Sequence, residues 1–544
     1  MFCNSINTKK ISRYLLLLIL LFSAVNGIAQ HKKHKKSSSS SGSSGHHSSS
    51  SHKSHSSHSS SAEHSSHGKK KHSHGSEEHS SRHHHHHSQE SDEGLTKSEA
   101  PDVEEGTRIA TPLDAILASV REPQFSSVEY NITTYGAVAD GQTDIKPALD
   151  KAIALCSIAG GGKVVIPKGT FFIAGPVVLK SHVNLHFEDG ATLVFSADDK
   201  KYLPAVLTMW EGTELYNYSP LFYAYQCTDV AITGNGIIAG AASKNFANWR
   251  PQGSTEQNTL RQMGIDGTPV YKRVFGDGYH LPPDMIQFFG CKNVLISGVT
   301  LLDAPYWVIH PVLCNNVTVQ NITISSRNLN NDGCDPESCT NVLIQGCNFN
   351  VGDDGVAIKA GRDQDGWRIG QPTENVIIRN CLFNSKTNGL CIGSEMSAGV
   401  RNVYMYNVKI TKCLSAIYFK SNQDRGGFIQ DIHVNNIFCD TAKSAFIRFE
   451  NNYHGSRGGQ HPTLFSDFII QDVSCKFAGE AGIYAVGVDG HPLQNITIKK
   501  ATILSTPQAQ VIVNTQNLTF DHVSINGQIY NEPTNTGVVK LKTD

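Results

Sequence analysis

Three aspartates near the middle of the chain are the strongest candidates for chemistry. Asp332 lies in the segment NNDG (330–333), and Asp353 and Asp354 lie in the segment GDDG (352–355). Carboxyl groups held close together push their pKa values apart, because ionising one raises the cost of ionising the next. One can then stay protonated and act as an acid while another acts as a base. Hydrolysis of a glycosidic bond uses such a pair of carboxyl groups. A single Asp-Gly pair more often only caps a turn, so the hypothesis needs all three acids to meet.

A short repeated unit would bring these segments together. Each unit starts with Asn or Asp and continues with about four residues of alternating apolar character, which predicts a strand. The units recur roughly every 22 to 36 residues and begin at Asp229, Asn293, Asn316, Asn341, Asn375, Asn402, Asp431, Asp467, Asn495 and Asn517. So short a unit cannot bury its own apolar face, so it must stack on its neighbours. The sequence therefore predicts an all-β solenoid, a parallel β-helix with coils about 4.8 Å apart.

The repeat also predicts where Asn and Cys side chains lie. We expect the first Asn or Asp of each unit to form a ladder along one corner of the solenoid. Cys291, Cys314 and Cys339 each lie two residues before a unit's Asn. Thirteen cysteines in a secreted chain would suggest disulfides, but equivalent positions stack, so buried thiol ladders are favoured. Cys334 and Cys339 are the best candidate pair if a disulfide forms.

Composition divides the chain into three segments. Residues 1–29 have a basic start and a short apolar stretch, which is typical of a secretory signal peptide. Residues 30–105 hold 17 of the 26 histidines among Ser, Lys and Gly, so this segment cannot pack a core. We interpret it as a disordered tether, and metal binding or pH-dependent attachment to an acidic surface is the alternative. Residues 106–544 form the predicted β-helix domain.

The beginning of the predicted domain and its charge add further expectations. Residues 130–156 read as a strand, a turn and an amphipathic helix, which would cap the open end of the solenoid. A net charge of −1 argues against a nucleic-acid partner. Beyond the signal segment there is no other long apolar run, so we expect no stable membrane insertion. We expect a monomer that is secreted, or periplasmic in a bacterium.

Several segments resemble one enzyme family in the correct order. They are TYGAVADGQTD, AGGGKVVIPKGTF, WEGTELYNYSPLFYA, APYWVIHPVLCNNVTVQNI, NNDGCDPESCTNVLI, GDDGVAIKAGR and IGSEMSAGVRNV. From about residue 130 to beyond residue 517, the chain resembles the polygalacturonase family of glycoside hydrolases, family 28. The resemblance implies a right-handed parallel β-helix and inverting hydrolysis of pectin-type chains, with no cofactor and no metal.

The resemblance also assigns roles to the three acids. Asp353 matches the general acid that protonates the leaving glycosidic oxygen. Asp332 and Asp354 match the pair that holds and activates water. Inverting hydrolases separate acid and base by roughly 6.5–9.5 Å to admit that water. One coil step plus a lateral offset predicts a distance of that order.

The chain departs from the family pattern at two positions. Asn388 stands where the family has a His, and an Asn can donate a hydrogen bond but cannot carry charge. A later strand has Tyr418, Phe419 and Lys420 where the family has Arg-Ile-Lys. Replacing a bidentate carboxylate clamp is not conservative. We expect Lys420, Asn388 and Tyr418 to contact the substrate, with Tyr418 stacking on a sugar face.

Other polar residues are candidates to rebuild the lost contact. Arg362 is the best replacement contact for a carboxylate, and Arg425 follows Lys420 on a loop that could approach the groove. His310 is expected to hold a neighbouring coil by hydrogen bonds rather than to act in catalysis. Single aromatic residues are expected to pack in the core or in loops: Trp307, Trp367 and Tyr453.

Three functions remain open at this point. The favoured one is a hydrolase with altered specificity, for example for rhamnogalacturonan or xylogalacturonan, or with exo action. The second is a catalytically impaired β-helix protein that binds pectic chains without cutting them. The third is a lyase that uses Ca²⁺ held by the clustered acids, with Lys420 or Arg425 as the base. The first is favoured because all three acids are present in the matching motifs.

Overall fold

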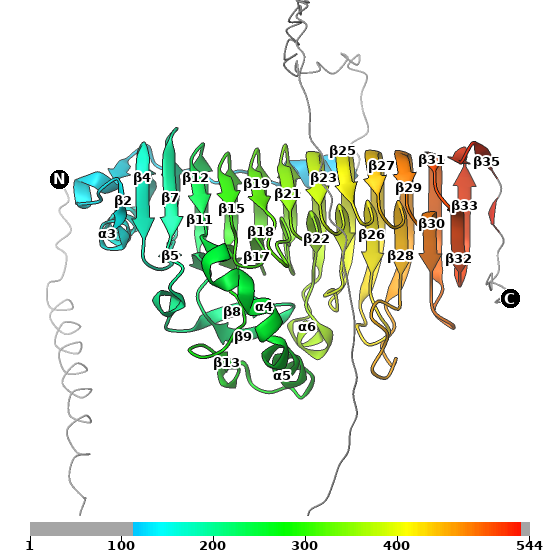
Figure 1. Cartoon of the computed structure of the whole chain (residues 1–544), viewed down its shortest axis with the longest axis horizontal. Coiled ribbons are helices and arrows are strands. Elements are labelled where there is room, and N and C mark those ends of the chain that lie inside the picture. The colour runs from blue at the N-terminus through cyan, green and yellow to red at the C-terminus, as the bar shows by residue number, and fades with distance from the viewer. Residues whose placement is uncertain (1–111, 532, 535–544) are drawn as a thin grey trace, which may run out of the picture. The chain divides into compact units, whose positions relative to one another are not determined.

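The computed structural model describes residues 112–531 and 533–534, and the chain from Asp102 onward is one compact unit. Most of the described residues form a right-handed parallel β-helix whose strands stack side by side along its axis (Figure 1). The predicted fold class is therefore confirmed. The signal peptide (1–29) and the tether (30–105) expected from the sequence lie outside the described residues.

Three strands from each coil build three faces. Strands of the first face pair in parallel register, as Val294 with Val317 and Val317 with Val342. The first face consists of β1 (Glu129–Asn131), β3 (Gly162–Ile166), β6 (Val183–Phe187), β11 (Thr228–Gly234), β15 (Lys292–Ser297), β18 (Asn315–Gln320), β20 (Thr340–Gln345), β23 (Thr373–Ser385), β25 (Val400–Cys413), β27 (Phe428–Ala442), β29 (Leu464–Ala478), β31 (Leu493–Ser505) and β33 (Thr515–Asp521).

The second face begins with separate short strands and continues in the second halves of the long strands from β23 onward. Its separate strands are β2 (Asp140–Asp144), β4 (Gly169–Ile173), β7 (Ala191–Phe195), β12 (Ile237–Ala239), β16 (Thr300–Leu302), β19 (Thr323–Ser326), β21 (Asn348–Val351) and β34 (Val523–Ile525). Antiparallel partners β35 (Gln528–Tyr530) and β36 (Pro533–Thr534) follow at the C-terminal end.

The third face carries the three aspartates. Isolated bridges at Cys334 join its two runs of strands, because Ile309 pairs with Cys334 and Cys334 pairs with Val356. The strands are β5 (Val177–Val178), β10 (Phe222–Tyr225), β14 (Ile286–Phe289), β17 (Ile309–Val312), β22 (Val356–Ile358), β24 (Leu390–Ile392), β26 (Ile417–Lys420), β28 (Ile447–Glu450), β30 (Ala481–Val486) and β32 (Gln508–Val513).

The predicted Asn ladder is present at the corner that begins the first face. Asn316 Nδ2 donates to Asn293 Oδ1 at 2.8 Å, and Asn402 Nδ2 donates to Asn375 Oδ1 at 3.1 Å. Every unit start has a left-handed backbone, with φ between 53° at Asp229 and 65° at Asp467. Asn and Asp tolerate that conformation better than other residues with a side chain, which explains their recurrence there.

The predicted thiol ladder is also present. The backbone N–H of Cys291 donates to Cys314 Sγ, and that of Cys314 donates to Cys339 Sγ, both at 3.4 Å. All twelve cysteines within the described residues are buried and free. The candidate disulfide between Cys334 and Cys339 is therefore not formed. In this run, stacking of equivalent positions places Cys291 beside Cys314 and Cys314 beside Cys339 in successive coils.

The N-terminal end of the solenoid is covered as the sequence predicted. Helix α3 (Lys146–Ile158) buries Leu149, Ile153 and Cys156 in the main core. Figure 1 shows α3 at the N-terminal end of the stacked strands. Ahead of it, α2 (Pro112–Ser119) packs Ile116 on Leu343 and Ile377. No helix within the described residues is long and apolar enough to cross a membrane.

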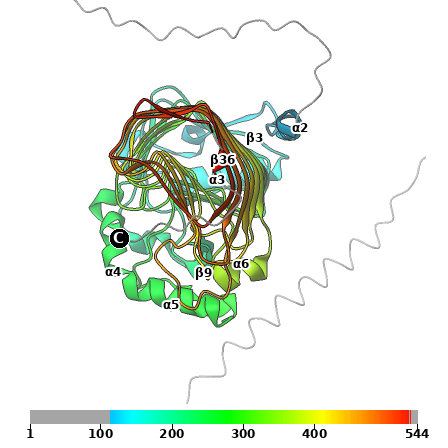
Figure 2. The ribbon, with the colours of Figure 1, turned by 90° about the vertical axis from the view of Figure 1, so that its right-hand side faces the viewer.

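A separate group of elements projects from one side of the solenoid, where Figure 2 shows the helices α4, α5 and α6 beside the coils. It has its own core, which includes Trp210, Leu260 and Tyr306. The sequence did not predict it, because its segments interrupt the repeat. Its elements are β8 (Val206–Trp210), β9 (Thr213–Asn217), α4 (Trp249–Gln252), α5 (Ser254–Ile265), β13 (Val274–Phe275) and α6 (Asp363–Ile369).

Candidate active site

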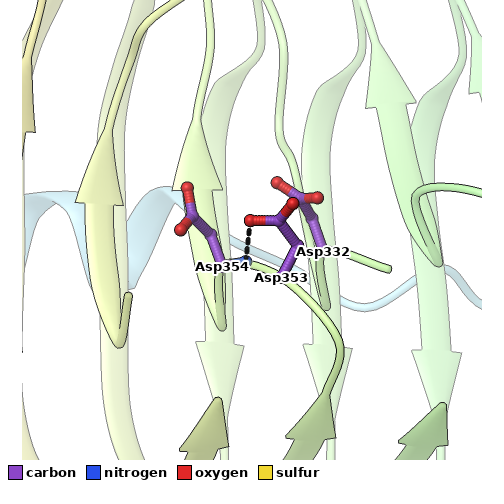
Figure 3. A group of neighbouring side chains, drawn as sticks. All are labelled: Asp332, Asp353 and Asp354. Carbon is purple, nitrogen blue, oxygen red and sulfur yellow. Dashed lines mark hydrogen bonds between the residues drawn. The ribbon is translucent and has the colours of Figure 1, made fainter. Parts of the chain in front are cut away.

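Adjacent coils bring the three predicted acids together. Asp332 precedes the bridge at Cys334, and Asp353 and Asp354 lie between β21 and β22 in the next coil. One carboxylate oxygen from each of the three lies within 4.8 Å of one from each of the others. Figure 3 shows the side chains directed into one shared space.

Two glycines allow this close stacking. The backbone N–H of Gly333 donates to the carbonyl oxygen of Asp354 at 2.9 Å. A Cβ added at Gly333 would lie 2.4 Å from the carbonyl oxygen of Gly355, and one added at Gly355 would lie 2.6 Å from that of Gly389. Any side chain at either position would push the coils apart. Both Asp-Gly pairs therefore hold the acids in register.

The nearest oxygens of the trio approach one another closely. One oxygen from each of Asp332, Asp353 and Asp354 lies within 4.8 Å of one from each of the others, whereas the two carboxyl groups of inverting enzymes are typically roughly 6.5–9.5 Å apart. Asp353 and Asp354 are consecutive in one turn, and Asp332 lies in the turn of the preceding coil. The expected separation of acid and base, which concerns whole carboxyl groups, stays a prediction.

Asp354 is the ionised member of the trio. Its Oδ2 accepts a hydrogen bond from Lys420 Nζ at 2.8 Å, and its Oδ1 accepts one from Asn388 Nδ2 at 2.6 Å. Burial alone would raise its pKa, but the charges of Lys420 and Lys359 and these hydrogen bonds lower the pKa of Asp354 to about 2. A carboxylate with this environment can act as a base or orient water.

The pKa values of Asp353 and Asp332 shift in the opposite direction, upward. Burial, followed by the charge of Asp354, raises the pKa of Asp353. Burial, followed by the charges of Asp335 and Asp353, raises the pKa of Asp332 well above its ordinary range. The Oδ1 atom of Asp332 is buried without a hydrogen-bond partner among the described residues. The trio thus contains carboxyl groups suited to carry a proton beside one that is ionised.

Hydrogen bonds fix the orientation of Asp353. Its Oδ1 accepts from the backbone N–H of Asp354 at 3.0 Å, the contact dashed in Figure 3. Asn330 Nδ2 donates to its Oδ2 at 3.2 Å, and the Thr387 hydroxyl lies 2.7 Å from its Oδ1. Asp353 is half-buried, whereas Asp332 and Asp354 are buried. Asp353 is therefore the acid of the trio that a substrate oxygen can approach.

The trio lines a charged cavity of about 510 Å³. Its walls come from the third face, from α4 and α5, and from the loop between β28 and β29. Besides the trio, three carboxylates line it in the described part of the chain: Glu211, Glu395 and Asp424. Seven cationic Lys and Arg side chains line it: Arg250, Arg261, Lys359, Arg362, Lys420, Arg425 and Arg457. The cavity suits an anionic ligand.

Three of the five predicted substrate-binding residues line this cavity. Lys420 lies against Asp354, as described above. Arg362 Nη1 donates to Glu395 Oε1 at 2.7 Å, and Arg425 Nη1 donates to Asp363 Oδ1 at 2.5 Å. Burial, followed by the charge of Arg362, lowers the pKa of Arg425 to about 10, so both guanidinium groups stay charged at neutral pH.

Asn388 and Tyr418 lie behind the lining instead. Asn388 is buried and acts on Asp354, and its Oδ1 accepts from the backbone N–H of Ser415 at 3.2 Å. The hydroxyl of Tyr418 donates to Glu450 Oε2 at 2.5 Å, and its ring packs on Tyr453. Tyr453 itself lines the cavity. Direct stacking of Tyr418 on a sugar, as the sequence suggested, does not fit this position.

His310 holds a buried network beneath the cavity, in line with its expected structural role. Its ring nitrogens lie 2.7 Å from Asp284 Oδ2 and 2.8 Å from Glu337 Oε2. Burial would lower its pKa, but these carboxylates raise the pKa of His310 to about 9. Of the aromatics, Trp307 lines the cavity, whereas Trp367 donates its Nε1–H to the carbonyl oxygen of Arg425.

Several lining residues escaped the sequence reasoning. One signal existed for Lys359, because Ile358, Ile392 and Phe419 pair across successive coils. The segments Ala-Ile-Lys and Tyr-Phe-Lys therefore align, and Lys359 is the counterpart of Lys420. Glu211 lies in the family-like segment WEGTELYNYSPLFYA, but that resemblance did not single it out. No signal existed for the other residues that the projecting elements and the later loops supply: Arg250, Arg261 and Arg457.

The trio also has the spacing that a divalent cation would need, which is what the lyase alternative requires. Two ammonium groups compete with that role. Lys420 Nζ is hydrogen-bonded to Asp354 Oδ2, and the charge of Lys359 acts on both Asp332 and Asp354. Fixed cations beside the acids already occupy or neutralise the oxygens that Ca²⁺ would need. The fold and the site together define a carbohydrate-active enzyme.

Comparisons with known proteins agree with this class. The family model for glycosyl hydrolases family 28 matches residues 164–524, and one described as rhamnogalacturonase A/epimerase, pectate lyase-like, matches residues 130–191. A solved hyperthermoactive exopolygalacturonase from Thermotoga maritima is 37% identical, with a TM-score of 0.76, covering 79% of this chain and 99% of that chain. A "Probable polygalacturonase" from Vitis vinifera is 29% identical over 403 residues, 70% of this chain and 75% of that protein. The chain belongs to glycosyl hydrolases family 28 and is a glycoside hydrolase.

Proposed function

We propose that the protein hydrolyses galacturonan, the uronic acid polymer of pectin, with inversion at the anomeric carbon and from a chain end. The observation that carries the proposal is the acid trio at the base of a cation-lined cavity. Hydrolysis of pectic chains is in keeping with the family and with relatives named polygalacturonases. The non-catalytic alternative is not favoured, because the relatives are named polygalacturonases and the trio combines one carboxyl group of lowered pKa with two of raised pKa.

The proposed mechanism divides the trio by protonation state. Asp353 carries the proton and delivers it to the leaving glycosidic oxygen. Asp354, kept ionised by Lys420 and Asn388, accepts a proton from a water molecule that it orients together with Asp332. That water attacks the anomeric carbon from the face opposite the leaving group. Fixing the reactants in this geometry and supplying the acid each lower the barrier.

Charge supports a uronate substrate over a neutral one. Seven cationic side chains and three carboxylates outside the trio line the cavity within the described residues, and guanidinium groups bind carboxylates through paired hydrogen bonds. A neutral backbone would leave the excess of positive charge in the lining without a counter-charge. Arg362 and Arg425 thereby take over the carboxylate contact that Tyr418 cannot make.

Walls on several sides support action at a chain end. Asn258, Arg261 and Ile265 of α5 line the cavity together with Tyr453 and Arg457 of the loop that follows β28. A polymer passing through the site would have to clear both walls, whereas a chain end needs only one entrance. The Thermotoga maritima structure with 37% identity is named an exopolygalacturonase.

The test is a panel of substrates with product analysis. Wild-type protein is incubated with polygalacturonate, rhamnogalacturonan and xylogalacturonan, and products are sized over time. We expect release of one small product from polygalacturonate while the polymer shortens slowly. A spread of oligomers from the first time points would contradict exo action. Proton NMR of the first product should show the anomer opposite to that of the substrate bond, and retention would contradict the mechanism.

A secreted monomer is part of the same proposal. A polymer substrate is met outside the cytoplasm, and residues 1–29 have the composition of a signal peptide. Aminoterminal sequencing of the protein recovered from medium or periplasm should begin after Gly27 or Ala29. Protein retained in the cytoplasm with Met1 intact would contradict secretion, and a dimer in sedimentation experiments would contradict the monomer.

A further inference from the structure

The arginine cluster of the cavity, defined as Arg250, Arg261 and Arg362, has no role in the bond-breaking step. Arg250 comes from α4, Arg261 from α5, and Arg362 from the residue before α6. All three meet at Glu211, with nitrogen–oxygen distances of 3.3 Å, 2.7 Å and 4.0 Å respectively. The cluster therefore belongs to the projecting elements and their borders rather than to the repeat.

Glu211 is a fixed anchor for these arginines. Gln257 Nε2 donates to its Oε2 at 2.6 Å and the Tyr306 hydroxyl donates to its Oε1 at 2.7 Å. Its backbone has a positive φ of 44°, and its side chain is buried. Burial would raise its pKa, but the arginines lower the pKa of Glu211. The carboxylate stays ionised and holds the guanidinium groups in place.

Charge and hydrogen bonds in this part of the cavity are unbalanced. Arg250, Arg261, Arg362 and Lys359 share two close carboxylates, Glu211 and Glu395, and Arg362 also lies 4.0 Å from Asp363. The other cations of the lining are matched one to one, since Lys420 pairs with Asp354, Arg425 with Asp363, and Arg457 with Asp363 and, at 4.0 Å, with Asp424. The surplus positive charge therefore lies at the arginine cluster.

The arginines also have unused donors. A guanidinium group carries five N–H donors, yet Arg250 and Arg261 each make a single side-chain hydrogen bond to Glu211. The Nε atoms of Arg250, Arg261 and Arg362 are buried with no hydrogen-bond partner among the described residues. Buried donors without a partner are costly, and a ligand carboxylate would satisfy both the charge and the hydrogen bonds.

We propose that the arginine cluster binds the carboxylate of the terminal uronate ring and so selects an unesterified chain end. The cluster is a positioning and specificity site, separate from Lys420, which acts on Asp354. This inference rests on the proposed function for the identity of the ligand, a uronate. A terminal ring seated against α4 and α5 would have no room for a further ring on that side, which accounts for action at the end.

Equilibrium binding to the full chain tests the proposal without requiring turnover. Calorimetric titrations compare galacturonate with galactose, which differ only in the carboxylate, for wild type, Arg261→Gln and Arg261→Lys. Wild type should bind galacturonate at least about tenfold more tightly than galactose. Arg261→Gln should lose about tenfold toward galacturonate and nothing toward galactose. Arg261→Lys should fall between them, because Lys keeps the charge and loses the planar fork.

Lys244→Gln is the matched control. Lys244 is an exposed cation of the same projecting region that does not line the cavity, so its loss should leave both affinities unchanged. A preference for galacturonate that survives Arg261→Gln would overturn the inference. So would an equal loss for both sugars, or the absence of any preference in wild type.

The same titrations separate this inference from the proposed function. An Arg261-dependent preference in a protein that releases nothing from galacturonan would refute only the proposed function. If the protein releases product from galacturonan but its preference for galacturonate does not depend on Arg261, only the proposed role of the arginine cluster would be refuted. Thermal unfolding of each variant shows whether a lost preference comes with a lost fold, and the ratio of the two sugars in one preparation is unaffected by a partly unfolded sample.

Discussion

The acid trio and the arginine cluster face one cavity but are positioned in different ways. Coil stacking places Asp332, Asp353 and Asp354, and the coil spacing sets their separation, with glycines that allow no Cβ. The arginines come from helices that interrupt the repeat and are held by one buried carboxylate, Glu211. In the proposed mechanism the repeat thus fixes the reacting groups, and the insertion supplies the arginines that we propose recognise the ligand. A substitution in each region should therefore have a different kind of effect.

The largest effect is expected from Asp354, the proposed base, which the repeat positions. Asp354→Asn keeps the shape of the side chain but removes the negative charge and the ability to accept a proton. We expect kcat on polygalacturonate to fall by roughly 10²- to 10⁴-fold with little change in KM. A rise in KM at unchanged kcat would contradict the assignment, because it would place Asp354 in binding rather than in chemistry.

A substitution of Lys420 should have the next largest effect, because Lys420 both stabilises the ionised form of Asp354 and lines the cavity. Lys420→Gln removes the charge that lowers the pKa of Asp354, so that pKa should rise. The base must be ionised, so the acid limb of the pH profile of kcat/KM should move to higher pH. We also expect a loss of about tenfold or more near neutral pH. An acid limb at the wild-type position would show that Lys420 does not set the pKa of Asp354.

Asn388 tests the same carboxylate with a smaller change. Asn388→Ala removes one neutral hydrogen bond to Asp354, which is worth about 1 kcal/mol and hence several-fold in rate. The acid limb should shift in the same direction as in Lys420→Gln, but less. Asn388→Gln, which keeps the amide at a different reach, serves as the comparison. If Asn388→Ala shifts the acid limb further than Lys420→Gln does, the charge of Lys420 would not affect the pKa of Asp354 more strongly than the hydrogen bond from Asn388, and our ranking would be contradicted.

The smallest effect on activity is expected at the Asn ladder. Asn402→Ala removes the hydrogen bond to Asn375 and leaves an Ala at a φ of 56°. This should lower the free energy of unfolding by about 1–2 kcal/mol, seen as a shift in the denaturant midpoint. Asn402→Gly, which tolerates that φ, should recover part of the loss. A change in kcat for Asn402→Ala would show that the ladder and the site are coupled.

Sequence reasoning succeeded where the structure repeats. The Asn and Cys positions predicted both ladders, and the two Asp-Gly segments predicted that Asp332 meets Asp353, because a solenoid turns sequence period into spatial adjacency. The sequence did not predict how closely the nearest oxygens of the acids approach, because it gives the coil step but not the lateral position of a turn. Lys359 was within reach of the same alignment argument and was missed.

The sequence could not predict the wall of the cavity. Arg250, Arg261 and Glu211 lie in segments without a repeat, so no periodicity relates them to the trio or to one another. Tyr418 shows a further limit: it lies two residues before Lys420 and so shares the outward face of β26, but its hydrogen bond to Glu450 and its packing on Tyr453 keep it out of the cavity. Motif alignment identifies a position in the coil and leaves the direction of the side chain to packing.

One measurement tests the central claim most directly: the rate of reducing-end release from polygalacturonate by wild type and by Asp353→Asn. Circular dichroism of both proteins establishes that the variant is folded. If Asp353 is the proton donor in a galacturonan hydrolase, wild type releases reducing ends and the variant loses at least about 100-fold of that rate. Equal rates in the two folded proteins would contradict the claim, and so would a wild type that binds polygalacturonate and releases nothing.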